Sequence, residues 1–216
     1  MELDEVMRTT FSCREFTDEP VSDADIEAII DHARFAPSGG NRQPARVVAV
    51  RDRDTLAALR SCAEPAMRVY LAQMAAGEAP WNTIDPSSVD IAERWHAAEP
   101  VEFLRFLDNA PVALCVGVDL SVVASFDSQL DRVGVISGAS IYPFVWNILL
   151  AARNRGLAGA LTTMCVGQEA AAQDLLGFPD HVALAAVVPL GHPVRQLTKL
   201  SRKPVADLLR YERWSD

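Results

Sequence analysis

A turn-rich stretch with short polar side chains is the first segment of this sequence that could do chemistry. It reads APSGGNRQP over residues 36–44, between a helix-periodic segment and a β-branched run. Its proline resists helix continuation and its two glycines admit backbone angles that residues with a Cβ avoid. Its serine and asparagine place donors and acceptors where they could face a ligand. The candidate binding residues are Pro37, Ser38, Gly39, Gly40 and Asn41. Taken alone, the stretch is more typical of a plain helix-to-strand loop.

Two arginines near opposite ends of the chain are candidates for anion binding. Arg14 lies near the start, and Arg202 lies in the basic segment 198–204. Arginine forks suit phosphate recognition, and Ser12 could add a hydroxyl donor. Each arginine alone is more typical of a solvated surface charge, and their combination with the 36–44 stretch is what favours a shared role.

Several familiar catalytic patterns are absent from the sequence. It contains no GxGxxG, GxxxxGK[ST] or GxSxG motif. Its four histidines never occur at metal-ligand spacing, and its four cysteines are far apart without a CxxC pair. We therefore predict no metal site, no disulfide framework and no catalytic side chain, so an enzyme of this sequence would need a cofactor that does the chemistry.

Composition limits the class of protein and its partners. Half of the 216 residues are hydrophobic and 23% are charged, as in a globular chain with a substantial core. The formal charge of −9 argues against a nucleic-acid partner. The longest apolar run, 139–152, is too short for a membrane span, and the acidic N-terminus without an apolar core predicts no signal peptide. We expect a cytoplasmic protein with reduced thiols.

Helical and strand patterns alternate along the chain. The expected helices are 2–8, one from the N-cap Ser22 to Ala33, 55–76 with a break near Pro65, 89–107, 135–154 ended by Gly156, and 169–176. The expected strands are 46–51, 111–118, 160–164 and 182–190. This order predicts an α+β or α/β sheet domain with helices on both faces.

Residues 77–107 are predicted to form a helical excursion from a single domain that spans residues 1–216. A linker rich in Pro, Asn, Ser and Gly begins this segment, and aromatic residues follow. Exposed aromatics would suit a lid or a partner-facing flap, while a helical pair packed on the core fits the pattern equally well.

Five short motifs, in the right order, resemble those of the nitroreductase-like flavoprotein family. They are SCREF at 12–16 followed by PV at 20–21, the stretch 36–44, NILLAA with GLAG at 147–159, PLGHP at 189–193 and SRKP at 201–204. They resemble the family's RSxRxF…PV, APSggNxQPW, NlLLAAxxxGLG and plGyP…Rkp segments. Together the matches cover nearly the whole chain.

The resemblance implies a three-layer α/β/α sandwich with a central mixed sheet, assembled as an intertwined homodimer with two flavins at the interface. It implies an FMN-dependent oxidoreductase that takes hydride from NADH or NADPH at flavin N5. The small-molecule electron acceptor would be a nitro compound, a quinone or an activated alkene. A specialised member such as a dehalogenase remains open, as does a flavin- or nucleotide-binding protein without turnover.

The resemblance also assigns roles to residues. Ser12 and Arg14 would meet the phosphate and the pyrimidine side of the flavin, and Arg202 would reach the phosphate. The segment 37–41 would cover the ring from the other subunit. The segment passing flavin N5 would be Leu161, Thr162 and Thr163, where a backbone N–H or the Thr163 hydroxyl could donate. Tyr142 and Trp146 could line the substrate face, although core packing is the commoner fate of such aromatics.

Two positions depart from the family pattern. Thr10 and Phe11 occupy the places where relatives carry a phosphate-binding arginine, and Ala45 stands where a tryptophan is common. Loss of one charge-assisted contact would cost about 1.5 to 3 kcal/mol of binding free energy. Arg8 or Lys199 could substitute for the missing arginine.

Overall fold

The apolar runs near residues 112–118 and 182–190 form the two central strands of a four-stranded sheet. In the computed structural model, which describes residues 1–214, the strand order is β1-β2-β4-β3 and every neighbouring pair is antiparallel. The strands are β1 (Ala45–Val50), β2 (Val112–Asp119), β3 (Ala158–Gly159) and β4 (Val182–Gly191). A parallel component comes from an isolated bridge between Ser12 and Gly159. β2 is buried along its whole length because both sheet faces are covered.

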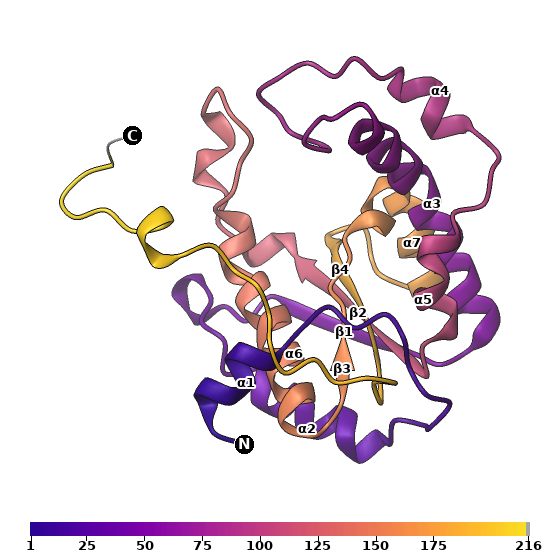
Figure 1. Cartoon of the computed structure of the whole chain (residues 1–216), viewed down its shortest axis with the longest axis vertical. Coiled ribbons are helices and arrows are strands. Elements are labelled where there is room, and N and C mark those ends of the chain that lie inside the picture. The colour runs from indigo at the N-terminus through magenta and orange to yellow at the C-terminus, as the bar shows by residue number, and fades with distance from the viewer. Residues whose placement is uncertain (215–216) are drawn as a thin grey trace.

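Helices cover the two faces of this sheet and make three layers (Figure 1). The helices are α1 (Leu3–Thr9), α2 (Asp23–Ala33), α3 (Arg53–Ala75), α4 (Ile91–His96), α5 (Arg105–Asn109), α6 (Tyr142–Asn154) and α7 (Glu169–Leu176). On one face α2 and α6 contribute Ile29 and Ile148 to the core, and on the other α3 and α5 contribute Leu59 and Leu107. The predicted α+β sheet with helices on both faces is confirmed.

The predicted break of the third helix near Pro65 is wrong. α3 runs unbroken from Arg53 to Ala75 with Pro65 inside it. A proline removes only one helical hydrogen bond, and the helix buries Leu59 before it and Met67 after it in the same core. Burial of this apolar face therefore outweighs the local preference of proline, as tertiary packing commonly does.

Other predicted boundaries shift for local reasons. α6 begins at Tyr142 rather than at 135, because Pro143 occupies its first turn, where a missing N–H costs nothing. The predicted helix 89–107 divides into α4 and α5, with Pro100 in the extended chain between them. The predicted strand 160–164 is wrong as a continuous strand, since β3 ends at Gly159 and Thr162 forms only an isolated bridge to β4.

Two tryptophans attach the segment after α3 to the body of the protein. Trp81 and Trp95 meet edge to face with ring centroids 6.3 Å apart, and the Trp81 indole N–H donates to the carbonyl of Ala66. Trp95 also packs against Gly167, where a Cβ would lie 2.7 Å from the indole ring. Further along, Leu104 and its neighbours at 106 and 107 are buried in the core. The last part of the predicted excursion therefore packs on the core.

Asp127 closes the loop between residues 127 and 136 with a buried carboxylate. Its Oδ2 atom accepts hydrogen bonds from the Val135 amide at 2.7 Å and from the Arg132 guanidinium at 2.9 Å. The Val135 bond, above the others, holds the pKa of this carboxyl below its ordinary value. A depressed pKa stabilises the closed loop above the ordinary aspartate pKa of about 3.9, and the contribution is lost as the pH falls through the lower folded value.

We expect the Val135 amide to be protected from hydrogen exchange at neutral pH and to lose that protection only below about pH 4. In Asp127→Asn the protection should fall already at neutral pH, because the charge-assisted bonds are gone. Protection factors measured by hydrogen exchange check this, with Asp131→Asn, an exposed change in the same loop, as the control. Equal protection in Asp127→Asn and the wild type would show that the carboxylate does not close the loop.

Candidate functional site

Two backbone donors lie unpaired on the outer edge of the segment that follows β3. The Ala160 amide donates to Pro189 at 3.3 Å and the Thr162 amide to Val187 at 3.0 Å, both in β4. Successive amides of an extended chain point to opposite sides, so the amides of Leu161 and Thr163 point away from β4. Neither donates to any partner within residues 1–214. The sheet therefore presents free N–H groups at this edge.

The N-terminal segment passes directly beside that edge. Ser12 pairs with Gly159, and the Cys13 amide donates to the Gly159 carbonyl at 2.9 Å. Further along, the segment is also held by Val194, whose amide donates to the Glu15 carbonyl at 3.1 Å. Cys13 is buried, and burial raises the pKa of its thiol, so it serves packing rather than nucleophilic chemistry. The structure thus brings Ser12 close to the predicted segment 161–163.

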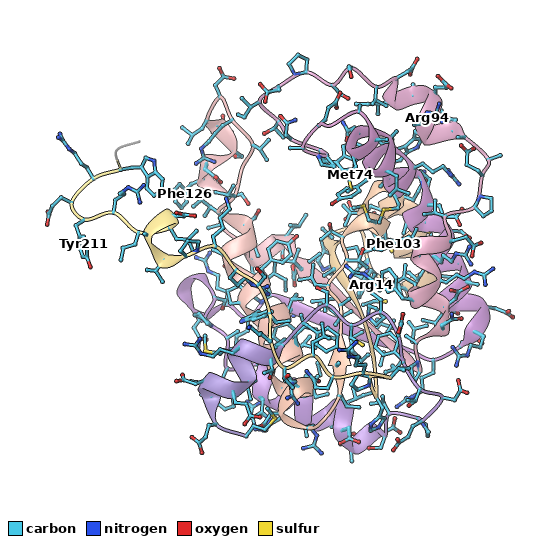
Figure 2. The ribbon with its side chains drawn as sticks, viewed as in Figure 1. Arg14, Met74, Arg94, Phe103, Phe126 and Tyr211 are labelled. Carbon is cyan, nitrogen blue, oxygen red and sulfur yellow. The ribbon has the colours of Figure 1, made fainter. Side chains whose placement is uncertain are left out.

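Ser12 and Arg14 share a pocket of about 260 Å³ between the N-terminal segment and the chain after β4. It is lined by Phe11, Ser12, Cys13, Arg14, Glu15, Arg195 and Leu197. Arg14 forms no ion pair within the described residues and stacks on two phenylalanine rings, of which Figure 2 labels Phe103. Arg195 is a cation that our sequence reasoning missed. Its position two residues after the PLGHP motif is the signal that could have identified it.

Arg202 lies in a second, cationic pocket rather than with Ser12 and Arg14. This pocket of about 500 Å³ is lined by Met7, Arg8, Thr198, Lys199, Leu200 and Arg202. Between the two pockets the side-chain Nε2 of Gln196 donates to the Thr9 carbonyl at 3.0 Å, which ties α1 to the tail. Arg8 and Lys199, the two candidates to replace the missing arginine, therefore lie together with Arg202. Their clustered positive charge favours an anionic group, although the whole chain carries −9.

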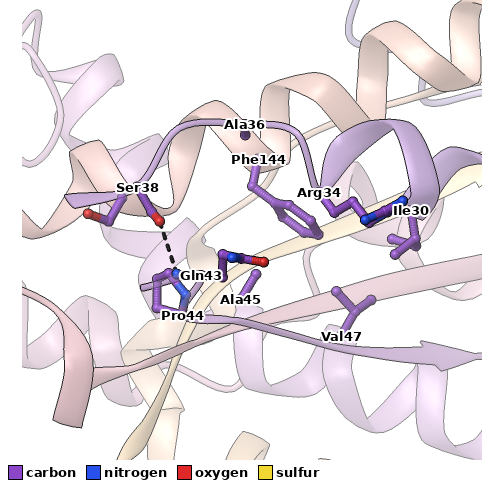
Figure 3. A pocket seen from close by; sticks show the side chains of 10 residues that line it. Ile30, Arg34, Ala36, Ser38, Gln43, Pro44, Ala45, Val47 and Phe144 are labelled. Carbon is purple, nitrogen blue, oxygen red and sulfur yellow. Dashed lines mark hydrogen bonds between the residues drawn. The ribbon is translucent and has the colours of Figure 1, made fainter. Parts of the chain in front are cut away.

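The 36–44 loop owes its shape to backbone conformation and two hydroxyl groups. Gly40 has φ of +61°, as predicted for a glycine here, and Asn41 and Gln43 also adopt positive φ. The Ser38 hydroxyl accepts a hydrogen bond from the Gln43 amide at 3.0 Å, drawn in Figure 3. The Ser140 hydroxyl accepts one from the Gly39 amide at 3.1 Å, which fixes the loop just before α6.

This loop borders a third pocket, away from Ser12 and Arg14. The pocket of about 340 Å³ lies between α2, β1 and α6 (Figure 3). It is lined by Ile30, Arg34, Ala36, Ser38, Gln43, Pro44, Ala45, Val47, Ser140 and Phe144. One chain therefore does not bring the loop and the 12–14 segment together in a single pocket.

The two aromatic residues predicted for the substrate face are exposed on α6. Neither Tyr142 nor Trp146 lines the pocket that contains Ser12 and Arg14. The Tyr142 hydroxyl donates to the Ala185 carbonyl at 3.3 Å, and partial burial raises the pKa of its phenol. Because both side chains are exposed, they are not core residues. Their ligand-facing role stays a prediction.

Two further properties of the described residues bear on function. Within residues 1–214 no group of three or more His, Cys, Asp or Glu side chains could hold a metal ion. Across the same residues no helix combines the length and apolar character needed to cross a membrane.

Known proteins resemble this chain over most of its length. A model of the nitroreductase family matches residues 7–192. A protein of Archaeoglobus fulgidus assigned as NADH dehydrogenase/NAD(P)H nitroreductase is 27% identical over 197 residues, covering 86% of this chain and 82% of that protein. Human iodotyrosine deiodinase 1 is 25% identical over 211 residues, covering 96% of this chain and 68% of the human protein.

Solved structures share the fold. The crystal structure of a Desulfovibrio desulfuricans protein assigned as a nitroreductase, in complex with FMN, aligns with a TM-score of 0.70 at 22% identity. The alignment covers 100% of this chain and 99% of the other. The α+β fold expected from the motif resemblance is thereby confirmed.

Proposed function

The chain belongs to the nitroreductase family, and we propose that it is an FMN-dependent oxidoreductase that uses NADH or NADPH to reduce nitro compounds, quinones or activated alkenes. The observation that carries this proposal is the pair of unpaired amides at Leu161 and Thr163 beside Ser12 and Arg14. A sheet edge that leaves N–H donors free is suited to a ligand with acceptors along one side.

The residues present fit FMN. An isoalloxazine ring carries nitrogen and oxygen acceptors along its edges, which the free amides of Leu161 and Thr163, the Ser12 hydroxyl and the Arg14 fork would bind. The phosphate tail needs positive charge, and the pocket of Arg8, Lys199 and Arg202 offers it. Bound FMN would supply hydride chemistry between a nicotinamide and an acceptor.

The chain's own residues bind and orient rather than transfer protons. The edge from Leu161 to Thr163 carries no carboxyl, imidazole or thiol. Its amide donors would stabilise negative charge that develops on the ring during reduction, as preorganised dipoles do. With a nitro compound the reaction balances as R–NO₂ + NAD(P)H + H⁺ → R–NO + NAD(P)⁺ + H₂O, with the two electrons from NAD(P)H and the one proton from solvent.

A homodimer is part of this proposal. The 37–41 segment borders a pocket separate from Ser12, so a second copy would have to supply it to the flavin. The C-terminal arm, defined as residues 204–214, supports such an exchange. It extends away from the body in Figure 1 and carries apolar side chains that are largely exposed, including Leu208 at 64% and Tyr211 at 82% (labelled in Figure 2). Exposed apolar side chains of this kind mark an interaction surface.

We expect the double variant Leu208→Asp/Tyr211→Asp to shift the protein from dimer to monomer, because charge would replace apolar contact with the partner. Size-exclusion chromatography with light scattering measures the mass. Ile84→Asp, at a residue 87% exposed in the segment between α3 and α4, is the control and should remain dimeric. A wild type that runs as a monomer, or a dimeric arm variant, would exclude this arrangement.

Turnover assays separate this function from its alternatives. We expect oxidation of NADH or NADPH to depend on a nitroarene, a quinone or an enone. Similarity to human iodotyrosine deiodinase favours one second candidate, a reductive dehalogenase. It would release iodide from 3-iodotyrosine under a chemical reductant and oxidise NAD(P)H poorly. Tight FMN binding without turnover of any acceptor would instead indicate a flavin-binding protein.

A further inference from the structure

We propose that Phe103 and Phe106 are positioning residues that hold the Arg14 guanidinium toward its pocket and so set the affinity for FMN. This inference rests on the proposed function. The Arg14 Cζ atom lies 5.1 Å from the centroid of the Phe103 ring and 5.6 Å from that of Phe106. The rings themselves meet edge to face at 5.9 Å. Arg14 therefore packs on a preassembled aromatic pair from a distant part of the chain (Figure 2).

The aromatic pair leaves the donors of Arg14 free. Aromatic rings attract the flat face of a guanidinium, while its N–H groups point outward in the plane. The one hydrogen bond recorded for this side chain within residues 1–214 is a long contact of 3.5 Å to the Ser12 carbonyl. The rings thus restrict the rotamers of the Arg14 side chain without occupying its N–H donors. Less conformational entropy is then lost when a ligand binds to Arg14.

The segment that carries the two rings is itself fixed to α3. Arg53 donates to the carbonyls of Asp108 and Ala110 at 2.7 and 3.0 Å. Arg60 pairs with the Asp108 carboxylate at 3.0 Å, and Glu64 accepts from the Val101 amide at 3.4 Å. Because both ends of the segment are held, the rings have a fixed position relative to the sheet.

Exposure of the outer ring agrees with this role. Phe106 is 5% exposed and belongs to the core, but Phe103 remains 50% exposed. Core packing explains Phe106, while the half-exposed Phe103 ring lies against Phe106 and Arg14. The predicted excursion 77–107 would then act on the cofactor site.

The test measures FMN dissociation constants by quenching of flavin fluorescence. Phe103→Leu keeps apolar volume and removes the ring, and we expect it to weaken FMN binding about three- to tenfold. Phe103→Trp restores a ring and should restore affinity. In an Arg14→Gln background Phe103→Leu should have no further effect, because the ring would act only through Arg14. Glu102→Gln, which breaks an exposed ion pair with Arg105 on the same segment, is the control and should leave affinity unchanged.

A second readout needs no flavin. The Arg14 Nε–H signal in a ¹⁵N NMR spectrum, identified by its loss in Arg14→Gln, should be shifted by the ring currents and should move toward the free-arginine position in Phe103→Leu. This inference alone is overturned if Phe103→Leu binds FMN as tightly as the wild type. It is also overturned if Glu102→Gln weakens FMN binding as much as Phe103→Leu does. A wild type that binds no FMN overturns the proposed function as well, and an unshifted Arg14 signal overturns the aromatic contact itself.

Discussion

The Gly159→Ala variant is expected to unfold about 2 to 12 °C below the wild type and to bind FMN more weakly. A Cβ at this position would lie 2.6 Å from the Pro189 carbonyl oxygen and 2.5 Å from a methyl group of Leu190. The backbone carbonyl of Pro189 cannot rotate away as a flexible side chain can, so the strands must shift. Overpacking of this kind costs about 1 to 3 kcal/mol, and each kcal/mol lowers the melting temperature by about 2 to 4 °C in a domain of this size.

The effect on FMN follows from the position of Gly159. Its carbonyl holds the Cys13 amide, and the free amides of Leu161 and Thr163 follow within four residues. A shift of this strand would misplace both sets of groups. Gly134→Ala is the control, since a Cβ there meets nothing closer than 3.5 Å. Calorimetry that finds equal melting temperatures for the two variants would contradict the close contact of β3 with β4.

Substitution of Arg14 by Gln is expected to weaken FMN binding by about tenfold or more, with little change in melting temperature. The side chain is exposed and forms no ion pair within the described residues, so the fold loses little. A hydrogen bond to a charged group contributes about 1.5 to 3 kcal/mol, and a neutral amide cannot replace the guanidinium fork. Isothermal titration with FMN measures the change.

Arg105→Gln provides the matched control for this change. It removes the same charge from an exposed arginine that, within residues 1–214, pairs only with Glu102 and lies outside the three pockets described above. Its FMN affinity should equal that of the wild type. If both variants weaken binding to the same extent, the effect is one of overall charge, and Arg14 has no place in the cofactor site.

The central strands and the sharp turn at residues 36–44 could be predicted because their signals are local. A continuous apolar run predicts a strand buried on both faces, and β2 and β4 are such strands. Gly40 at positive φ is what a glycine in this turn predicts. Ser22 caps α2 through the Asp25 amide, as its residue type and position predict.

Features that depend on tertiary contacts could not be predicted in this way. The continuity of α3 through Pro65 depends on the core packed against both of its halves. The separation of Arg202 from Arg14 depends on the path of the tail along α1, which Gln196 fixes. The stacking of Arg14 on Phe103 joins residues far apart in the sequence, and neither residue type predicts contact with the other.

The visible spectrum of the purified protein, taken after incubation with FMN and removal of free flavin, tests the central claim most directly. The account predicts a yellow protein that retains one FMN per protein chain and is bleached by NADH or NADPH. A protein that stays colourless after this treatment would contradict the assignment of Ser12, Arg14 and the free amides at Leu161 and Thr163 to a flavin site.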